Sequence, residues 1–378
     1  MKDNKKKVLI IGPAHPLRGG LATYDERLCR ELNKQGHTCH ILSFSLQYPS
    51  FLFPGKTQYS DDPAPEGVTI FSEINSVNPL NWLKVGLKYK KLNYDVVIFR
   101  YWMSFMGPAF GSIARIIKSN KHTKVLAITD NVVPHERKFF DTPFTKYFLP
   151  VCDGFLTMSQ AVKLDLEAFN VQKPVKYVPH PMYDNFGPLL PKAEAKKQLG
   201  LDPGTNYLLF FGFIRGYKGL SILLDAFADE RLKPLNLKLI VAGEFYEDSK
   251  PYYEQVECHK LQDVVIMKND FIPNDQVSAY FSAADVVVQP YTNATQSGVT
   301  QIAYYYNKPM IVTNVGGLAE LVPDNKVGFV TEVNTHKIAE AIIRFYAEDK
   351  EAAFSANIET EKQRFTWQNL CRELLSMA

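Results

Sequence analysis

The sequence has little cysteine and no long apolar run. Its five cysteines are far apart and odd in number, so they indicate neither a disulfide framework nor a zinc site: Cys29, Cys39, Cys152, Cys258 and Cys371. The apolar run near the N-terminus leads straight into Gly12 and Pro13, so we expect no export signal. No stretch approaches the ~20 apolar residues of a membrane span, and we expect a cytoplasmic protein.

A large excess of charge of one sign is also missing. The chain has 43 Lys and Arg against 40 Asp and Glu, a net charge of +3, which argues against a nucleic-acid partner and leaves anionic small molecules open. Its 378 residues, 46% of them hydrophobic, exceed the size of one core and predict two domains.

Several catalytic motifs are absent. The first apolar run is followed by "GPAHPLRGGLATY", which is neither a G-x-G-x-x-G fingerprint nor a Walker loop, so a dinucleotide oxidoreductase or a P-loop ATPase is not expected. No H-E-x-x-H, G-x-S-x-G or Cys-His arrangement occurs, so hydrolysis by a side-chain nucleophile has no support. No metal site is predicted.

Short, near-continuously apolar runs alternate with amphipathic stretches, which predicts parallel sheets covered by helices on both faces. The first series of predicted strands lies at 7–11, 39–44, 68–71, 95–99, 124–129 and 154–159. After a Pro- and Gly-rich pause the second series lies at 207–213, 237–243, 264–272, 285–291 and 309–315. We predict two doubly wound, Rossmann-like domains (1–185 and 186–355) facing a cleft, and a C-terminal helical segment (356–378) that returns to the first.

Arg215 and Lys218 follow the first strand of the second domain, with a glycine beside each. Two fixed cations there could hold a diphosphate and stabilise a leaving phosphate without a metal ion, or form a solvated basic turn. Cations are unfavourable near a helix N-terminus unless an anion pairs with them, which favours the functional interpretation.

Three further segments follow predicted strands. Gly19 and Gly20 open a helix, where backbone N–H groups could approach a phosphate or a sugar, or simply form a tight turn. A second helix begins near Ser297, so Ser297, Gly298, Val299 and Thr300 could offer N–H groups to an anion, or Ser297 could be an ordinary N-cap. Glu320 could accept a sugar or ribose hydroxyl, or be a first-turn acid.

In "AITDNVVPHE", Asp130 directly follows a strand, so its carboxylate should lie at the edge of the cleft, with His135 on the loop beyond. Asp130 could bind sugar hydroxyls or be a structural buried acid.

Residues 78–95 form a basic amphipathic helix with Trp82, Leu83 and Leu87 among four lysines. Such a helix either contacts an anionic membrane peripherally or covers a sheet; the apolar loop at 48–55 raises the same question.

Together, Gly19-Gly20, "FGFIRGYKGL" and "DVVVQPY…SGVTQIAYYYNKPMIVTNVGGLAELV" resemble the retaining GT-B glycosyltransferases of family four over nearly the whole chain. The resemblance implies metal-independent transfer of a sugar from a nucleotide diphosphate donor, UDP- or GDP-linked, with no cofactor. By it, Arg215 and Lys218 hold the diphosphate, residues 297–300 offer backbone to the nucleotide, and Gly19 and Gly20 border donor and acceptor.

The chain departs from that family twice. Many members carry two Glu residues eight positions apart near 295–305, where this chain offers only Gln296 and Gln301; we assign the ribose contact to Gln301. Relatives often have His where Asp130 stands, so Asp130 is our first choice for a sugar contact and His135 the second.

The expected function is a hexosyltransferase of polysaccharide biosynthesis with a glycan or lipid-linked acceptor. The alternatives are a sugar-nucleotide epimerase or phosphorylase on the same fold, and a non-catalytic nucleotide-sugar-binding protein.

Overall fold

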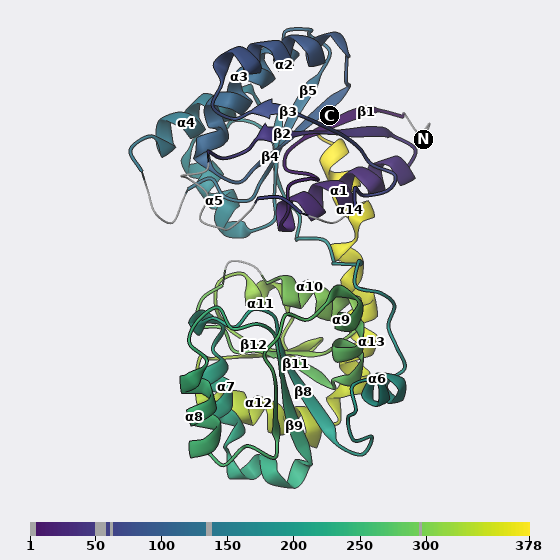
Figure 1. The fold of residues 1–378 in the computed structure, drawn as a ribbon, viewed down its shortest axis with the longest axis vertical. Coiled ribbons are helices and arrows are strands. Elements are labelled where there is room, and N and C mark those ends of the chain that lie inside the picture. The colour runs from purple at the N-terminus through teal and green to yellow at the C-terminus, as the bar shows by residue number, and fades with distance from the viewer. Residues whose placement is uncertain (1–4, 50–57, 61–62, 134–137, 295–296) are drawn as a thin grey trace. The chain divides into compact units, whose positions relative to one another are not determined.

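The computed structural model describes residues 5–49, 58–60, 63–133, 138–294 and 297–378. These residues divide into two compact units (Figure 1). Unit 1 comprises the chain up to Pro179 together with Trp367–Ala378, and unit 2 comprises His180–Thr366. Each unit is a parallel sheet between helices, as the alternation of apolar runs predicts.

Unit 1 contains a seven-stranded parallel sheet of order β3-β2-β1-β4-β5-β6-β7. Its strands are β1 (Lys7–Ile11), β2 (Thr38–Leu46), β3 (Thr69–Asn75), β4 (Val96–Tyr101), β5 (Lys124–Thr129), β6 (Gly154–Thr157) and β7 (Val175–Tyr177). Because strand order reverses between β1 and β4, a crevice for ligands is expected at the carboxyl ends of these two strands.

Successive side chains along the strands of unit 1 point to opposite faces of the sheet and belong to two hydrophobic cores. One core packs the sheet against α2 (Pro79–Lys91), α3 (Gly107–Lys118), α4 (Asp141–Phe148) and α5 (Gln160–Ala168). The other packs it against α1 (Gly20–Lys34) and α14 (Trp367–Leu375). The ring centroids of Tyr24 and Trp367 lie 4.9 Å apart in this second core, so the C-terminal helix is part of unit 1.

Unit 2 contains a six-stranded parallel sheet of order β10-β9-β8-β11-β12-β13. Its strands are β8 (Asn206–Phe211), β9 (Leu237–Ala242), β10 (Val265–Lys268), β11 (Val286–Gln289), β12 (Met310–Thr313) and β13 (Gly328–Thr331). The reversal of strand order falls between β8 and β11, so the loops after these strands border the second expected crevice.

The helices of unit 2 also form two layers. The core on one face takes residues from α7 (Leu220–Phe227), α8 (Lys250–Cys258) and α12 (Thr335–Ala347). The core on the other face takes residues from α9 (Asn274–Ala283), α10 (Gly298–Tyr305) and α11 (Leu318–Leu321). Two further helices, α6 (Lys192–Gln198) and α13 (Lys350–Glu361), complete the unit. None of the described helices combines the length and the apolar character needed to cross a membrane.

The observed unit boundaries differ from the predicted ones. The first boundary lies at 179/180 rather than 185/186, and the predicted C-terminal segment 356–378 is divided between the units. Ile358 and Phe365 are fully buried in the α9 to α11 core of unit 2, and only the part from Trp367 onward joins unit 1. The sequence shows the helical periodicity of this segment but not which core each turn fills.

Candidate functional site

The residues predicted after β8 and β11 gather at the switch point of unit 2. The Thr292 N–H donates to the Tyr217 carbonyl oxygen at 2.7 Å, which ties the loop after β11 to the loop after β8. Gly219 has φ +72°, and a Cβ there would lie 2.0 Å from the Pro290 carbonyl oxygen. Only glycine fits this close approach, so the glycine after Lys218 fixes the loop that carries both predicted cations.

Arg215 and Lys218 lie on one short loop, and neither forms an ion pair with an acidic residue among the described residues. The Arg215 guanidinium is exposed and lies 5.0 Å from the Tyr246 ring centroid. The Lys218 side chain is buried, with Nζ 5.7 Å from the Tyr291 ring centroid. Burial, and secondarily the charge of Arg215, lowers the pKa of Lys218 to about 8. An anion bound here would relieve both effects.

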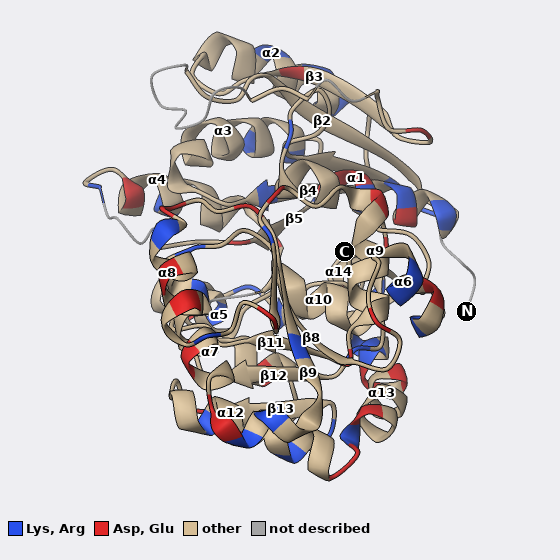
Figure 2. Ribbon diagram, turned by 60° about the horizontal axis from the view of Figure 1, so that its bottom comes forward, with Lys and Arg blue, Asp and Glu red and all other residues tan. Residues whose placement is uncertain are grey.

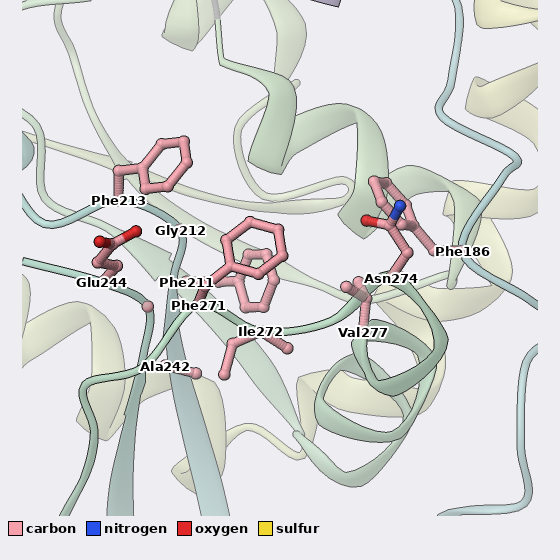
Figure 3. A pocket seen from close by; sticks show the side chains of 11 residues that line it. Phe186, Phe211, Gly212, Phe213, Ala242, Glu244, Phe271, Ile272, Asn274 and Val277 are labelled. Atoms are coloured by element: carbon pink, nitrogen blue, oxygen red, sulfur yellow. The ribbon is translucent and has the colours of Figure 1, made fainter. Parts of the chain in front are cut away.

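A largely apolar pocket of about 150 Å³ lies beside these cations, at the carboxyl ends of β8 and β9 (Figure 3). It is lined by Phe186, Phe211, Gly212, Phe213, Ala242, Gly243, Glu244, Phe271, Ile272, Asn274 and Val277. A Cβ on Gly212 would lie 3.0 Å from Lys218 Nζ, so the buried amine is next to the pocket wall. Pocket and positive charge are thus adjacent.

The mouth of the pocket is aromatic. Phe213 and Phe271 are 41% and 59% exposed, although aromatic rings of this size are usually buried. The Phe213 ring centroid lies 4.4 Å from that of Tyr246 and 6.4 Å from that of Phe271. Figure 3 shows the Glu244 carboxylate at one side of the pocket and Asn274 at the other. Exposed rings with polar groups beside them suit a flat heterocycle.

The start of α10 has both features considered from the sequence, an N-cap and first-turn N–H groups that an anion could bind. Ser297 is an N-cap, whose Oγ accepts from the Thr300 N–H at 3.4 Å. The hydroxyls of Ser297 and Thr300 donate to Gln289 Oε1 at 2.6 and 3.1 Å. The first-turn N–H groups, including those of Gly298 and Val299, have no intrahelical acceptor. A Cβ on Gly298 would lie 3.3 Å from the Tyr183 ring, so that ring lies close to the helix start.

Gln301 is only 1% exposed, and neither atom of its amide group has a hydrogen-bond partner among the described residues. The Gln289 Nε2 atom is likewise buried without a partner in the described chain. The ribose contact at Gln301 therefore stays a prediction and would require the side chain to reorient. Glu320, by contrast, is exposed in α11 beyond Gly316 and Gly317, and within the described chain its carboxylate forms no ion pair.

In unit 1, Gly19 has φ +115° and is the N-cap of α1. A Cβ on Gly19 or Gly20 would meet nothing within 4 Å in the described structure, so this backbone is open to a ligand. His135 and Gln296 lie outside the described residues.

Asp130 follows β5 as predicted, and its carboxylate is engaged by Arg100. The Nε and Nη2 atoms of Arg100 each donate to one Asp130 oxygen at 2.6 Å. The Arg100 side chain is 3% exposed, whereas that of Asp130 is 21% exposed. Burial raises the pKa of Asp130, and the Arg100 charge opposes that rise. Asp130 therefore presents the accessible edge of a largely buried ion pair.

Two residues of α1 complete this cluster. The Arg100 guanidinium lies 3.9 Å from the Tyr24 ring centroid. Asp25 is fully buried and its carboxyl oxygens have no hydrogen-bond partner in the described chain, so burial raises its pKa well above the usual range. A Cβ on Gly12 would lie 2.2 Å from Asp25 Oδ2, so the glycine after β1 leaves room for this carboxyl group.

Arg100 and the aromatic pocket were not predicted from the sequence. An arginine inside the apolar run "DVVIFRY" was a signal for a buried acidic partner, since a charge is rarely buried unpaired. Phenylalanines directly after β8 and before α9 were a weaker signal. No cluster of three or more possible metal-ligating side chains occurs within the described chain.

Comparison with known proteins agrees with this architecture. Glycosyltransferase Family 4 matches residues 18–183, and Glycosyl transferases group 1 matches residues 191–361. An uncharacterized glycosyltransferase of Methanocaldococcus jannaschii is 23% identical over 98% of this chain and 97% of its own length. A D-inositol 3-phosphate glycosyltransferase of Pseudarthrobacter chlorophenolicus is 29% identical, but the match covers only 37% of this chain and 34% of that protein.

Two solved structures share the fold. Sucrose-phosphate synthase of Thermosynechococcus elongatus has a TM-score of 0.69 at 18% identity, over 99% of this chain and 100% of that one. HepE of Anabaena in complex with UDP has a TM-score of 0.72 at 18% identity, over 98% and 100%. The predicted fold is confirmed, and the chain belongs to the family 4 (group 1) glycosyltransferases, with two Rossmann-like domains of the GT-B fold.

Proposed function

We propose that this protein transfers a sugar from a nucleotide diphosphate sugar to a hydroxyl group of an acceptor. The observation that carries the proposal is the pairing of two cations, Arg215 and Lys218, with an aromatic pocket at the switch point of unit 2. Neither cation has an acidic partner among the described residues, so an anionic ligand would supply the missing charge.

In this proposal the pocket holds the base of the donor and the cations hold its diphosphate. Phe213 and Phe271 would stack on the heterocycle, and the first turn of α10 would offer N–H groups to phosphate oxygens. Glu320 and Gln301 are the proposed hydroxyl contacts. HepE is known in complex with UDP and with UDP-glucose, which makes UDP the first nucleotide to test.

The proposed reaction retains the configuration of the anomeric carbon. The bond from that carbon to the donor phosphate oxygen breaks, and the acceptor oxygen bonds to the carbon on the same face. The acceptor proton passes to an oxygen of the leaving diphosphate. Arg215 and Lys218 stabilise the charge that develops on the leaving group, so we propose that no divalent metal ion is required.

The acceptor is proposed to be a glycan or a lipid-linked sugar. An alpha-monoglucosyldiacylglycerol synthase of Streptococcus pneumoniae, by name an enzyme of lipid substrates, is 30% identical over 40% of this chain. Gly19, Gly20, Asp130 and His135 are the proposed contacts of unit 1 with the acceptor or with the donor sugar.

A thermal-shift series tests the donor site first. UDP-, GDP- and ADP-sugars are added to the native protein, because a ligand that binds only the native state raises its melting temperature. One nucleotide series should stabilise the protein, with and without EDTA; no shift with any of them contradicts the proposal. Incubation with the stabilising donor alone, and then with acceptors, separates transfer from epimerisation and from binding without turnover.

A further inference from the structure

Helix α2 of unit 1 exposes a stripe of leucines. Leu80, Leu83 and Leu87 are 78%, 49% and 45% exposed, and their spacing of three and four residues places them along one face. Val77 and Leu92, just outside the two ends of the helix, are 45% and 40% exposed. Single exposed leucines are ordinary, but a continuous stripe of them indicates an interaction surface.

The stripe belongs to a well-anchored helix. Asn78 caps α2 by accepting from the backbone N–H groups of Leu80 and Asn81. The Trp82 Nε1–H donates to the Asn75 carbonyl oxygen at 2.8 Å on the inner side. A Cβ on Gly86 would lie 2.8 Å from Ile116, so α2 packs closely on α3. The exposed leucines are therefore presented by a folded element.

Lysines flank the stripe on both sides. At 100° per residue, Lys84 and Lys91 lie along one edge and Lys90 along the other. These three have no acidic partner among the described residues, whereas Lys88 is paired with Glu73. In Figure 2, where Lys and Arg are blue, blue segments of the ribbon are visible at α2.

The surrounding sequence is almost free of acidic residues. Between Glu73 and Asp130, a stretch that includes α2, β4, α3 and β5, the only acid is Asp95. Its carboxylate accepts from the Lys7 N–H at 2.7 Å and lies 2.8 Å from His122 Nε2. This stretch therefore contributes a single carboxylate, that of Asp95, against the four lysines of α2.

We propose that this leucine stripe and its flanking lysines, hereafter the α2 surface, dock on a lipid bilayer containing anionic headgroups. Lysine is depleted at protein interfaces, whereas at a membrane it can lay its methylenes along the apolar region and keep its ammonium among the headgroups. The three leucines would enter the interface while the lysines contact phosphates. The proposal does not depend on the transfer reaction.

Vesicle flotation with the full chain tests the proposal. The native protein should float with phosphatidylcholine vesicles that contain about a third phosphatidylglycerol, and at least tenfold less with phosphatidylcholine alone or in about 0.5 M NaCl. The variants Leu83→Gln/Leu87→Gln and Lys84→Glu/Lys91→Glu should each reduce flotation at least tenfold. A matched control on other helices, Leu164→Gln/Lys197→Glu, changes an exposed leucine and an exposed lysine and should float as the native protein does.

A second readout locates the contact. Cys258 is the one exposed cysteine among the five, so Cys258→Ser allows a single environment-sensitive dye to be placed through Leu87→Cys or, as control, Leu164→Cys. Emission should shift to the blue with anionic vesicles only for the dye at 87. No flotation of the native protein, or equal flotation of all variants, overturns the proposal. So does a native dimer that Leu83→Gln/Leu87→Gln converts to a monomer, which would assign the α2 surface to a second copy.

Discussion

Arg100 and Asp130 form a bidentate ion pair in unit 1, with Nε and Nη2 each 2.6 Å from one carboxylate oxygen. The pair joins Asp130, which directly follows β5, to Arg100 inside the neighbouring strand β4. It gives Asp130 a structural task in addition to the sugar contact predicted for it. Any experiment on Asp130 has to separate these two tasks.

The variant Asp130→Asn should lower the free energy of unfolding by about 2–4 kcal/mol, because it leaves the buried Arg100 guanidinium without its counter-charge. Urea denaturation at neutral pH measures this. The control Glu373→Gln breaks the more exposed pair with Lys176 and should change the free energy by less than about 1 kcal/mol. Equal effects of the two changes would show that the Arg100–Asp130 pair is not effectively buried.

The sugar contact is tested by Asp130→Asn beside His135→Ala, assayed at a temperature where both variants are folded. If Asp130 binds the transferred sugar, Asp130→Asn lowers kcat/KM by roughly tenfold or more beyond any change in the folded fraction. Loss of transfer only in His135→Ala would show that His135 is the contact instead.

Removing either cation after β8 should slow transfer. Arg215→Ala and Lys218→Ala are each expected to lower kcat/KM by about a hundredfold, the usual effect of losing one donor to transition-state charge. Lys197→Ala, at an exposed lysine of α6, is the control and should leave kcat/KM unchanged. Native-like rates in both variants would refute the assignment of the diphosphate.

The position of Asp130 could be predicted because "KVLAIT" is a continuous apolar run and the residue after such a strand lies at the carboxyl edge of the sheet. The pairing of Asp130 with Arg100 could not be predicted, because the periodicity of the strands does not tell which acidic side chain lies next to Arg100 on the face of the sheet that α1 covers. The three-residue strand β7 was also missed, since its residues are only half-buried and show no apolar run.

The aromatic pocket could not be predicted from the sequence either. Phe213, Tyr246 and Phe271 follow β8, β9 and β10, and they meet only because these strands are neighbours in the order β10-β9-β8. Neighbouring strands can be guessed from a doubly wound pattern, but the direction in which each exposed ring points depends on the local loop. That Arg215 and Lys218 lie near each other was easier to predict, because both are on one short loop closed by Gly219.

Phe271→Ala should raise the Kd of the nucleotide about tenfold or more, since stacking of one base on one ring contributes roughly 1–3 kcal/mol. Phe271 is largely exposed, so the melting temperature without ligand should not fall. Phe139→Ala, which removes a ring that is 95% exposed in unit 1, is the control and should bind the nucleotide as the native protein does. Titration calorimetry measures the Kd of both variants. An unchanged Kd for Phe271→Ala would show that the base does not bind in this pocket.

The free protein should be more stable without the charge of Lys218. The pKa of Lys218 is about 8 in the folded protein and near 10.5 in the unfolded chain, so the folded state binds this proton less tightly. Between these two values the unfolded chain carries more protons, and stability therefore rises with pH across that window. Below pH 8 the loss of stability caused by the buried Lys218 charge is fully present. A pKa shift of this size corresponds to at most about 3 kcal/mol.

Lys218→Met keeps most of the side-chain volume and removes the charge, so it should raise the free energy of unfolding by roughly 1–3 kcal/mol at pH 7. The advantage over the native protein should shrink as the pH rises from 8 toward 10.5. Urea denaturation of both proteins at several pH values measures the difference. With UDP present the order should reverse, because the diphosphate pairs with the Lys218 ammonium and stabilises only the native chain. If the variant is less stable than the native protein at pH 7 without ligand, the charge of Lys218 does not destabilise the free protein. The proposal that the site keeps this charge for an anion would then be wrong.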